Sequence, residues 1–81
     1  MDQTRFTTVG SRINFAKTLV GDGTIKSLSE ATGISIPQIS RYTGNITDPP
    51  LGRAVTIANA ARLNLLWLAT GEGEVFQKSD S

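Results

Sequence analysis

The sequence contains no cysteine and no histidine. The missing cysteine excludes disulfide bonds and cysteine zinc sites, and it suits a reducing compartment. The remaining serines, lysines and carboxylates have no spacing that defines a nucleophile with its base. The sequence therefore predicts a protein that catalyses no reaction and holds no metal or other cofactor.

Long apolar runs are missing as well. No run approaches the length of a membrane span, and no signal peptide is visible, so we expect a cytoplasmic protein that does not contact a membrane. A chain of 81 residues is long enough for one small domain. We expect a single domain over residues 1–81, in which residues 76–81 form a flexible tail or the start of a linker.

The formal net charge is only +1, but the two signs are unevenly distributed. Basic residues outnumber acidic ones up to residue 62, whereas the segment after residue 71 is acidic. A modest basic excess in the body suits a nucleic-acid binder that relies on a few well-placed phosphate contacts.

Apolar periodicity and capping residues predict an all-α fold of five helices without strands. The expected helices cover residues 9–20, 25–32, 35–43 with Ser35 as the cap, 51–61, and 65–70. The other expected N-caps are Thr8, Thr24 and Asn64, and glycine ends the second and fifth helices. In the fifth helix we expect Trp67 to be a buried anchor of the core.

The segment from Ile25 to Asn45 is the most informative part of the chain. Two short helices flank Gly33, and only a few residues turn the chain between them. This pattern is typical of the DNA-binding helix-turn-helix, in which the second helix enters the major groove. At the start of that second helix, Ser35 and Gln38 predict a capping box, and Pro37 falls in the first turn, where its missing N–H costs nothing.

The second helix of this pair has two predicted faces. Ile39 and Tyr42 are one turn apart and are expected to point inward. Arg41 on the opposite face suits a bidentate contact with guanine, and Gln38 suits adenine. The apolar pair next to the cap suits a thymine methyl group. The candidate base-reading residues are Ser35, Ile36, Pro37, Gln38, Ser40 and Arg41.

A second set of residues flanks this face and is suited to contacts with the DNA backbone. The candidate phosphate-contacting residues are Thr24, Lys26, Thr43, Asn45 and Arg53. Plainer interpretations stay open for two of the base-reading candidates. Arg41 could be an ordinary solvated charge, and Ile36 could pack against the fifth helix instead of facing DNA.

Three features of the chain resemble the N-terminal DNA-binding domain of lambda-type, CI-like phage repressors. They are residues 28–42 with Gly-Ile-Ser at the turn, the Tyr-Thr-Gly-Asn sequence of residues 42–45 before the prolines, and the Trp-Leu-Ala-Thr-Gly-Glu-Gly sequence of residues 67–73. The resemblance implies a five-helix lambda-repressor-like fold with a helix-turn-helix. It also implies a homodimer on double-stranded operator DNA, in a bacterial host cell if a phage or prophage encodes the chain.

Two positions depart from that family. Many relatives have glutamine where Ile25 opens the second helix, so Thr24 or Lys26 must replace its phosphate contact. Relatives also often have a polar residue where Pro37 stands, so one base contact is expected to be missing.

Alternative functions are a Cro-like regulator or activator, and an antitoxin or adaptor that binds a protein. Affinity for duplex DNA that falls steeply with salt would distinguish a DNA binder from an adaptor.

Overall fold

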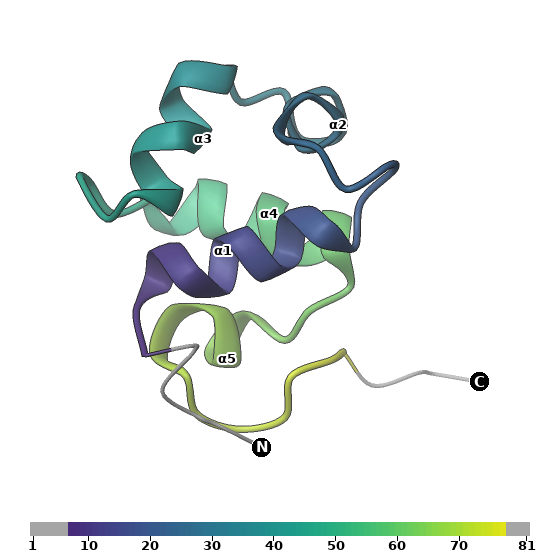
Figure 1. Ribbon diagram of the computed structural model, residues 1–81. Helices are drawn as coiled ribbons and strands as arrows, with labels where there is room; N and C mark the ends of the chain where they lie inside the picture. The colour runs from purple at the N-terminus through teal and green to yellow at the C-terminus, as the bar shows by residue number, and fades with distance from the viewer. Residues whose placement is uncertain (1–6, 78–81) are drawn as a thin grey trace.

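Five helices form the part of the chain that the structure describes. The computed structural model describes residues 7–77, and Figure 1 shows the arrangement of its helices. They are α1 (Val9–Thr18), α2 (Ile25–Thr32), α3 (Ile36–Thr43), α4 (Leu51–Ala61) and α5 (Leu65–Thr70). Residues 7–77 contain no strand, so the predicted all-α fold class is confirmed. No helix within these residues is long and apolar enough to cross a membrane.

The predicted N-caps are confirmed. The side chain of Thr24 accepts a hydrogen bond from the backbone N–H of Ser27 at 3.2 Å, and the caps of α1, α3 and α5 accept equivalent bonds. The predicted capping box of α3 is half formed. Ser35 accepts from the Gln38 N–H at 3.4 Å, but the half-buried Gln38 side chain makes no return bond to Ser35 among the described residues. The complete capping box belongs to α1 instead.

The first helix ends at Thr18, two residues before the predicted end. The N–H of Leu19 bonds the carbonyl of Ala16 at 3.0 Å, and the N–H of Val20 bonds that of Lys17 at 3.2 Å. These bonds span three residues instead of four, so they tighten the last turn and end the α-helix. Val20 is nevertheless buried, as its place in the apolar stripe predicts.

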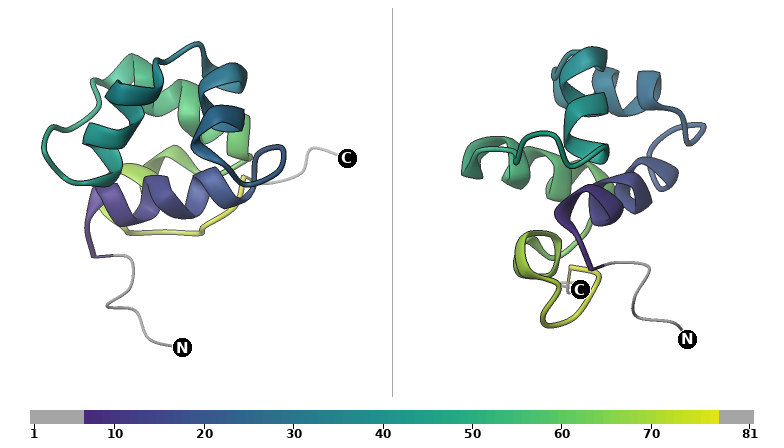
Figure 2. Two further views of the ribbon diagram at one scale, coloured as in Figure 1. Left: turned by 45° about the horizontal axis from the view of Figure 1, so that its top comes forward. Right: turned by 60° about the vertical axis from the view of Figure 1, so that its left-hand side comes forward.

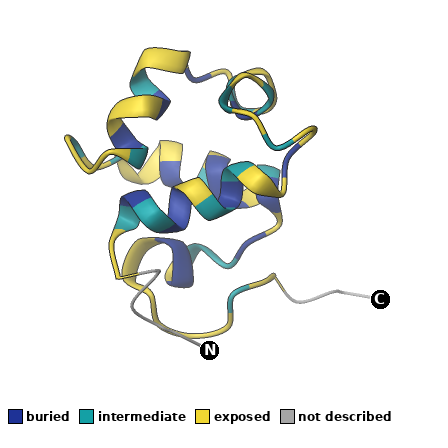
Figure 3. Ribbon diagram, viewed as in Figure 1, coloured by how far each residue is buried: buried dark blue, intermediate teal, exposed yellow. Residues whose placement is uncertain are grey.

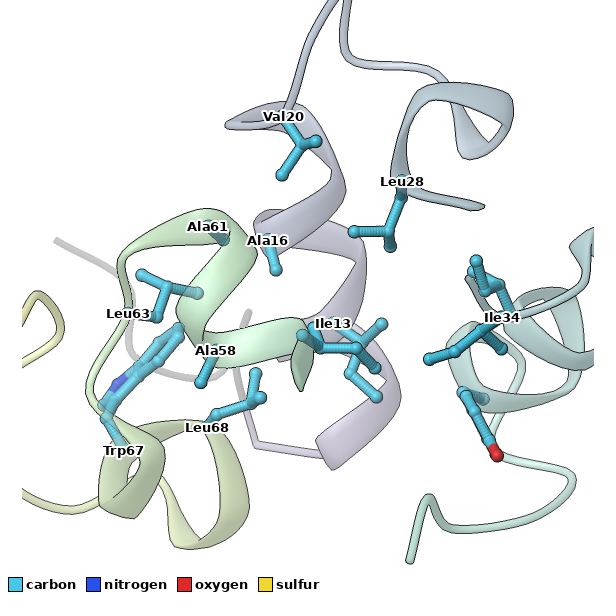
Figure 4. Close-up of a cluster of buried hydrophobic side chains, with 13 residues drawn as sticks. Ile13, Ala16, Val20, Leu28, Ile34, Ala58, Ala61, Leu63, Trp67 and Leu68 are labelled. Carbon is cyan, nitrogen blue, oxygen red and sulfur yellow. The ribbon is translucent and has the colours of Figure 1, made fainter. Parts of the chain in front are cut away.

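One apolar core joins all five helices. Figure 1 and the right-hand view of Figure 2 show α1 between α2 and α3 on one side and α5 on the other, and α1 contacts each of the other helices. Figure 4 shows Ile13 and Ala16 of α1 facing side chains of α4 and α5. Trp67 of α5 is only 6% exposed, and its ring meets the edge of Phe15 at a centroid distance of 5.8 Å. The prediction that Trp67 anchors the core is confirmed.

Arg12 is a buried cation that the sequence analysis counted among the basic residues of the body. It is 4% exposed, and its Nε donates to the carbonyl of Leu68 at 2.9 Å. Its Nη2 donates to the carbonyl of Ala69 at 3.4 Å. Arg12 therefore stabilises the C-terminal end of α5, where backbone carbonyls lack partners within the helix.

The chain after α5 returns to the segment between α4 and α5. Phe76 pairs with Leu63 in an isolated antiparallel bridge, and the N–H of Gln77 donates to the carbonyl of Arg62 at 3.0 Å. Residues 76 and 77, which the sequence analysis placed in a flexible tail or the start of a linker, thus contact the chain before α5 through their backbones. Their backbone groups find partners where α4 has ended, because Arg62 turns the chain with a φ of 58°. Residues 78–81 lie outside the described part.

Candidate nucleic-acid interface

Three residues, 33–35, connect α2 to α3. Gly33 ends α2 in the left-handed conformation with a φ of 77°, and its N–H donates to the carbonyl of Ser29 at 2.8 Å. The hydroxyl of Ser29 then donates to the carbonyl of Ile34 at 2.5 Å. Ile34 is itself buried, so the turn is fixed by both hydrogen bonds and packing. Gly33 has the conformation that the sequence predicted for it.

The inward and outward faces of α3 agree with the predicted ones. Ile39 and Tyr42 are fully buried, and Figure 3 shows most of the remaining helix surface as exposed. Ile36 is 43% exposed. Because α3 makes no contact with α5, the alternative in which Ile36 packs against the fifth helix is wrong. Five of the six base-reading candidates are exposed and Gln38 is half-buried; the exposed ones are Ser35, Ile36, Pro37, Ser40 and Arg41.

A hydrogen bond between two side chains connects α3 to the first turn of α4. Nη1 of Arg53 donates to the hydroxyl of Tyr42 at 2.9 Å. The ring of Tyr42 lies in the core, whereas Arg53 is an exposed residue. The bond therefore holds the Arg53 guanidinium beside the C-terminal end of α3. From the sequence, Tyr42 had only a core role, because Arg53 follows it by 11 positions across a loop whose path the sequence does not define.

Asn45 uses its side-chain amide to join the end of α3 to the start of α1. Its Oδ1 accepts from the N–H of Gly10 at 2.9 Å, and its Nδ2 donates to the hydroxyl of Thr8 at 3.2 Å. The hydroxyl of Thr43 donates to the carbonyl of Ser40 at 3.1 Å, inside α3. Both phosphate-contacting candidates therefore already have partners within the protein, and their contact with DNA stays a prediction.

Thr24 lies beside a carboxylate. Oδ1 of Asp22 accepts from the Thr24 hydroxyl at 2.6 Å, from the Thr24 N–H at 3.1 Å and from the Ser27 hydroxyl at 2.6 Å. These bonds from Ser27 and then Thr24 lower the pKa of Asp22 to about 2, since they stabilise the charged form. A phosphate at Thr24 would meet this negative charge. Lys26, which is exposed on the first turn of α2, is thus the better-suited phosphate contact of the two.

The lowered pKa of Asp22 predicts a measurable acid sensitivity. Since its folded pKa of about 2 lies below the ordinary value of 3.8, Asp22 stabilises the fold above pH 3.8 and loses that effect as the pH falls towards 2. Asp22→Asn keeps an acceptor oxygen but loses the charge. We expect the variant to melt at a lower temperature than the wild type at pH 7, and the difference to shrink as the pH approaches 2. Melting curves by circular dichroism test this, and a difference independent of pH would contradict it.

Comparisons with known proteins identify no relative of this chain. No protein family, no curated protein and no solved structure matches it. The exposed cations of the candidate interface are Lys26 on α2, Arg41 on α3 and Arg53 on α4, and the eight residues of α3 include no carboxylate.

Proposed function

We propose that this chain is a sequence-specific, DNA-binding transcriptional regulator of the lambda-type repressor kind. In this proposal α2 and α3 form a helix-turn-helix, and α3 lies in the major groove of operator DNA. The observation that carries the proposal is the exposed face of α3. That face presents Arg41, Ser40 and the residues of the first turn to solvent, while Ile39 and Tyr42 hold the helix to the core.

The outward face of α3 suits the edges of base pairs. Arg41 is exposed in the last turn of α3, and its guanidinium can donate two parallel hydrogen bonds to O6 and N7 of one guanine. Since α3 carries no acidic side chain, no charge on the helix would repel the phosphates at the rim of the groove. Arg41, exposed and without a carboxylate on its own helix, is therefore suited to contact a base.

The first turn of α4 suits a backbone phosphate. The side chain of its N-cap, Pro50, makes no capping hydrogen bond to the backbone, and the turn contains no acidic residue. Helix N-termini in this condition favour anions, because the first N–H groups lack partners within the helix. Arg53 belongs to the same turn, and Tyr42 holds its guanidinium beside α3. A phosphate here would receive both the backbone and the guanidinium donors.

We expect two copies of the chain to bind one operator. A recognition helix of eight residues contacts too few base pairs to specify a unique binding site in a genome. A palindromic site with half-sites about one helical turn apart would double the number of base pairs that are read. The proposed partner is accordingly double-stranded operator DNA bound by a homodimer.

Substitutions of Arg41 and Arg53 separate base reading from phosphate binding. Arg41→Ala is expected to cost about 1–3 kcal/mol on the operator and to flatten the preference at one base position. Arg53→Ala is expected to weaken binding to operator and scrambled DNA alike and to reduce the salt slope by about one phosphate contact. Titrations of labelled operator and scrambled duplexes at several salt concentrations measure both effects.

Arg41→Lys is the matched control for the base-reading role. Lysine keeps the positive charge but lacks the planar fork, so this variant should lose the base preference while it keeps the salt slope of the wild type. If Arg41→Ala weakens operator and scrambled DNA equally and no base position loses its preference, α3 is not the reading helix.

The second candidate function is a protein-interaction module. It is favoured by two exposed apolar side chains. Ile46 lies in the connection between α3 and α4 and is 76% exposed, and Leu51 is the first residue of α4 and is 71% exposed. Large apolar side chains exposed to this degree are frequent in surfaces that bind a partner protein. A chain that binds no duplex at low salt would favour this candidate over DNA binding.

A further inference from the structure

We propose that the first turn of α3 recognises the C5 methyl group of a pyrimidine, so that DNA methylation at that position regulates binding. This inference rests on the proposed function, because it requires α3 to lie in the major groove. The C5 methyl group of thymine is exposed in that groove, and 5-methylcytosine carries the same group at the same ring position. A surface that reads only the methyl group would accept both bases and reject uracil and cytosine.

The first turn of α3 exposes two apolar side chains to solvent. Ile36 is 43% exposed, and Pro37 beside it is also an exposed residue. The other apolar residues of this helix, Ile39 and Tyr42, are buried in the core. Among the described helices, only α1 and α2 bring their backbones close to α3. The contact of α4 with α3 through Arg53 is made at Tyr42, almost two turns from Ile36. Ile36 and Pro37 therefore form an exposed apolar pair at the start of α3.

Polar groups that could identify a base are scarce in this turn. Pro37 has no backbone N–H, and its ring offers no donor or acceptor. The hydroxyl of Ser35 accepts the Gln38 N–H at 3.4 Å, but it can still donate to O4 of thymine or accept from N4 of cytosine, so it does not distinguish the two bases. Gln38 is half-buried. The apolar pair can therefore detect a methyl group but cannot tell O4 of thymine from N4 of cytosine.

Arg41 reads by a different chemistry at a different base pair. It follows Pro37 by four residues, which corresponds to about 6 Å along the helix axis. Successive bases of a strand are about 3.4 Å apart, so Arg41 would reach a pair about two steps from the methyl group. The basic side chains around α3 favour a polyanionic duplex over a protein as the occupant of this surface.

The test begins with selection of a bound sequence from a random pool of duplexes by the 81-residue chain. Each thymine of that sequence is then replaced by deoxyuridine, which removes only the methyl group. At one position in each half-site we expect the Kd to rise about four-fold for each methyl group removed. At the same position a 5-methylcytosine·guanine pair should bind about as well as thymine·adenine, and unmethylated cytosine·guanine as poorly as uracil·adenine.

Two variants test whether Ile36 is responsible for the response to the methyl group. Ile36→Ala should bind the thymine and uracil duplexes equally, because the side chain that covers the methyl group is gone. Ile46→Ala removes an exposed isoleucine outside α3 and should keep the full response. Equal melting temperatures of the two variants and the wild type exclude unfolding as the cause.

The outcomes separate this inference from the proposed function. A duplex that is selected but whose binding ignores the methyl group overturns methyl recognition and leaves DNA binding intact. A methyl response that survives in Ile36→Ala overturns the assignment of the methyl contact to Ile36. If no duplex is enriched at all, the proposed function fails, and methyl recognition fails with it.

Discussion

Trp67→Ala is expected to destabilise the protein by about 3–5 kcal/mol, the usual cost of removing a large aromatic side chain from a core. Trp67 is 6% exposed, and its ring meets the edge of Phe15 at 5.8 Å. Total stabilities of small domains are about 5–15 kcal/mol, so this loss would remove a large share of the stability of the protein. Urea unfolding followed by circular dichroism measures the change, since the variant no longer has the tryptophan signal.

Leu66→Ala is the control for this substitution, because Leu66 precedes Trp67 in α5 but is 54% exposed. We expect this variant to cost about 1 kcal/mol or less, as is usual for exposed positions. The fluorescence of the wild type should also be blue-shifted and resist quenching by iodide. Equal costs for the two substitutions, or a freely quenched Trp67, would contradict the burial of the ring.

Gly10→Ala is expected to cost about 3 kcal/mol, the upper end of the usual range for overpacking. A Cβ atom on Gly10 would lie 2.7 Å from the backbone carbonyl oxygen of Tyr42 and 2.6 Å from Oδ1 of Asn45. The Asn45 side chain could move, but only by giving up the hydrogen bond that it accepts from the Gly10 N–H. The carbonyl belongs to α3, so α1 and α3 would have to separate. Chemical denaturation of the variant measures the loss.

Gly52→Ala provides a matched control in another helix. Gly52 lies in the first turn of α4, and a Cβ atom there would meet nothing within 4 Å. Alanine restricts the unfolded chain and favours the helix, so this variant should gain about 0.5–1 kcal/mol. The two glycine substitutions should therefore change the stability in opposite directions. If Gly10→Ala is as stable as Gly52→Ala, the close approach of α1 and α3 is wrong.

The faces of α3 and the limits of the helices, except the end of α1, were predictable from the sequence, because local interactions decide them. Thr24 bonds the N–H of a residue only three positions later, and Gly33 and Gly71 take left-handed conformations that other residues rarely adopt. The burial of Ile39 and Tyr42 follows from the helical period. The exposed face of α3, which belongs to the candidate interface, could therefore be predicted from the sequence.

The partners of polar side chains were decided by the tertiary structure. Arg12 bonds the carbonyl of Leu68, which lies 56 residues away, and Asn45 bonds the N–H of Gly10, which lies 35 residues away. Periodicity tells which face of a helix is apolar, but it does not tell which neighbour that face meets or how close the two backbones come. Arg12 and Asn45 therefore look like surface groups in the sequence. In the fold they satisfy backbone groups that packing has brought within hydrogen-bond distance.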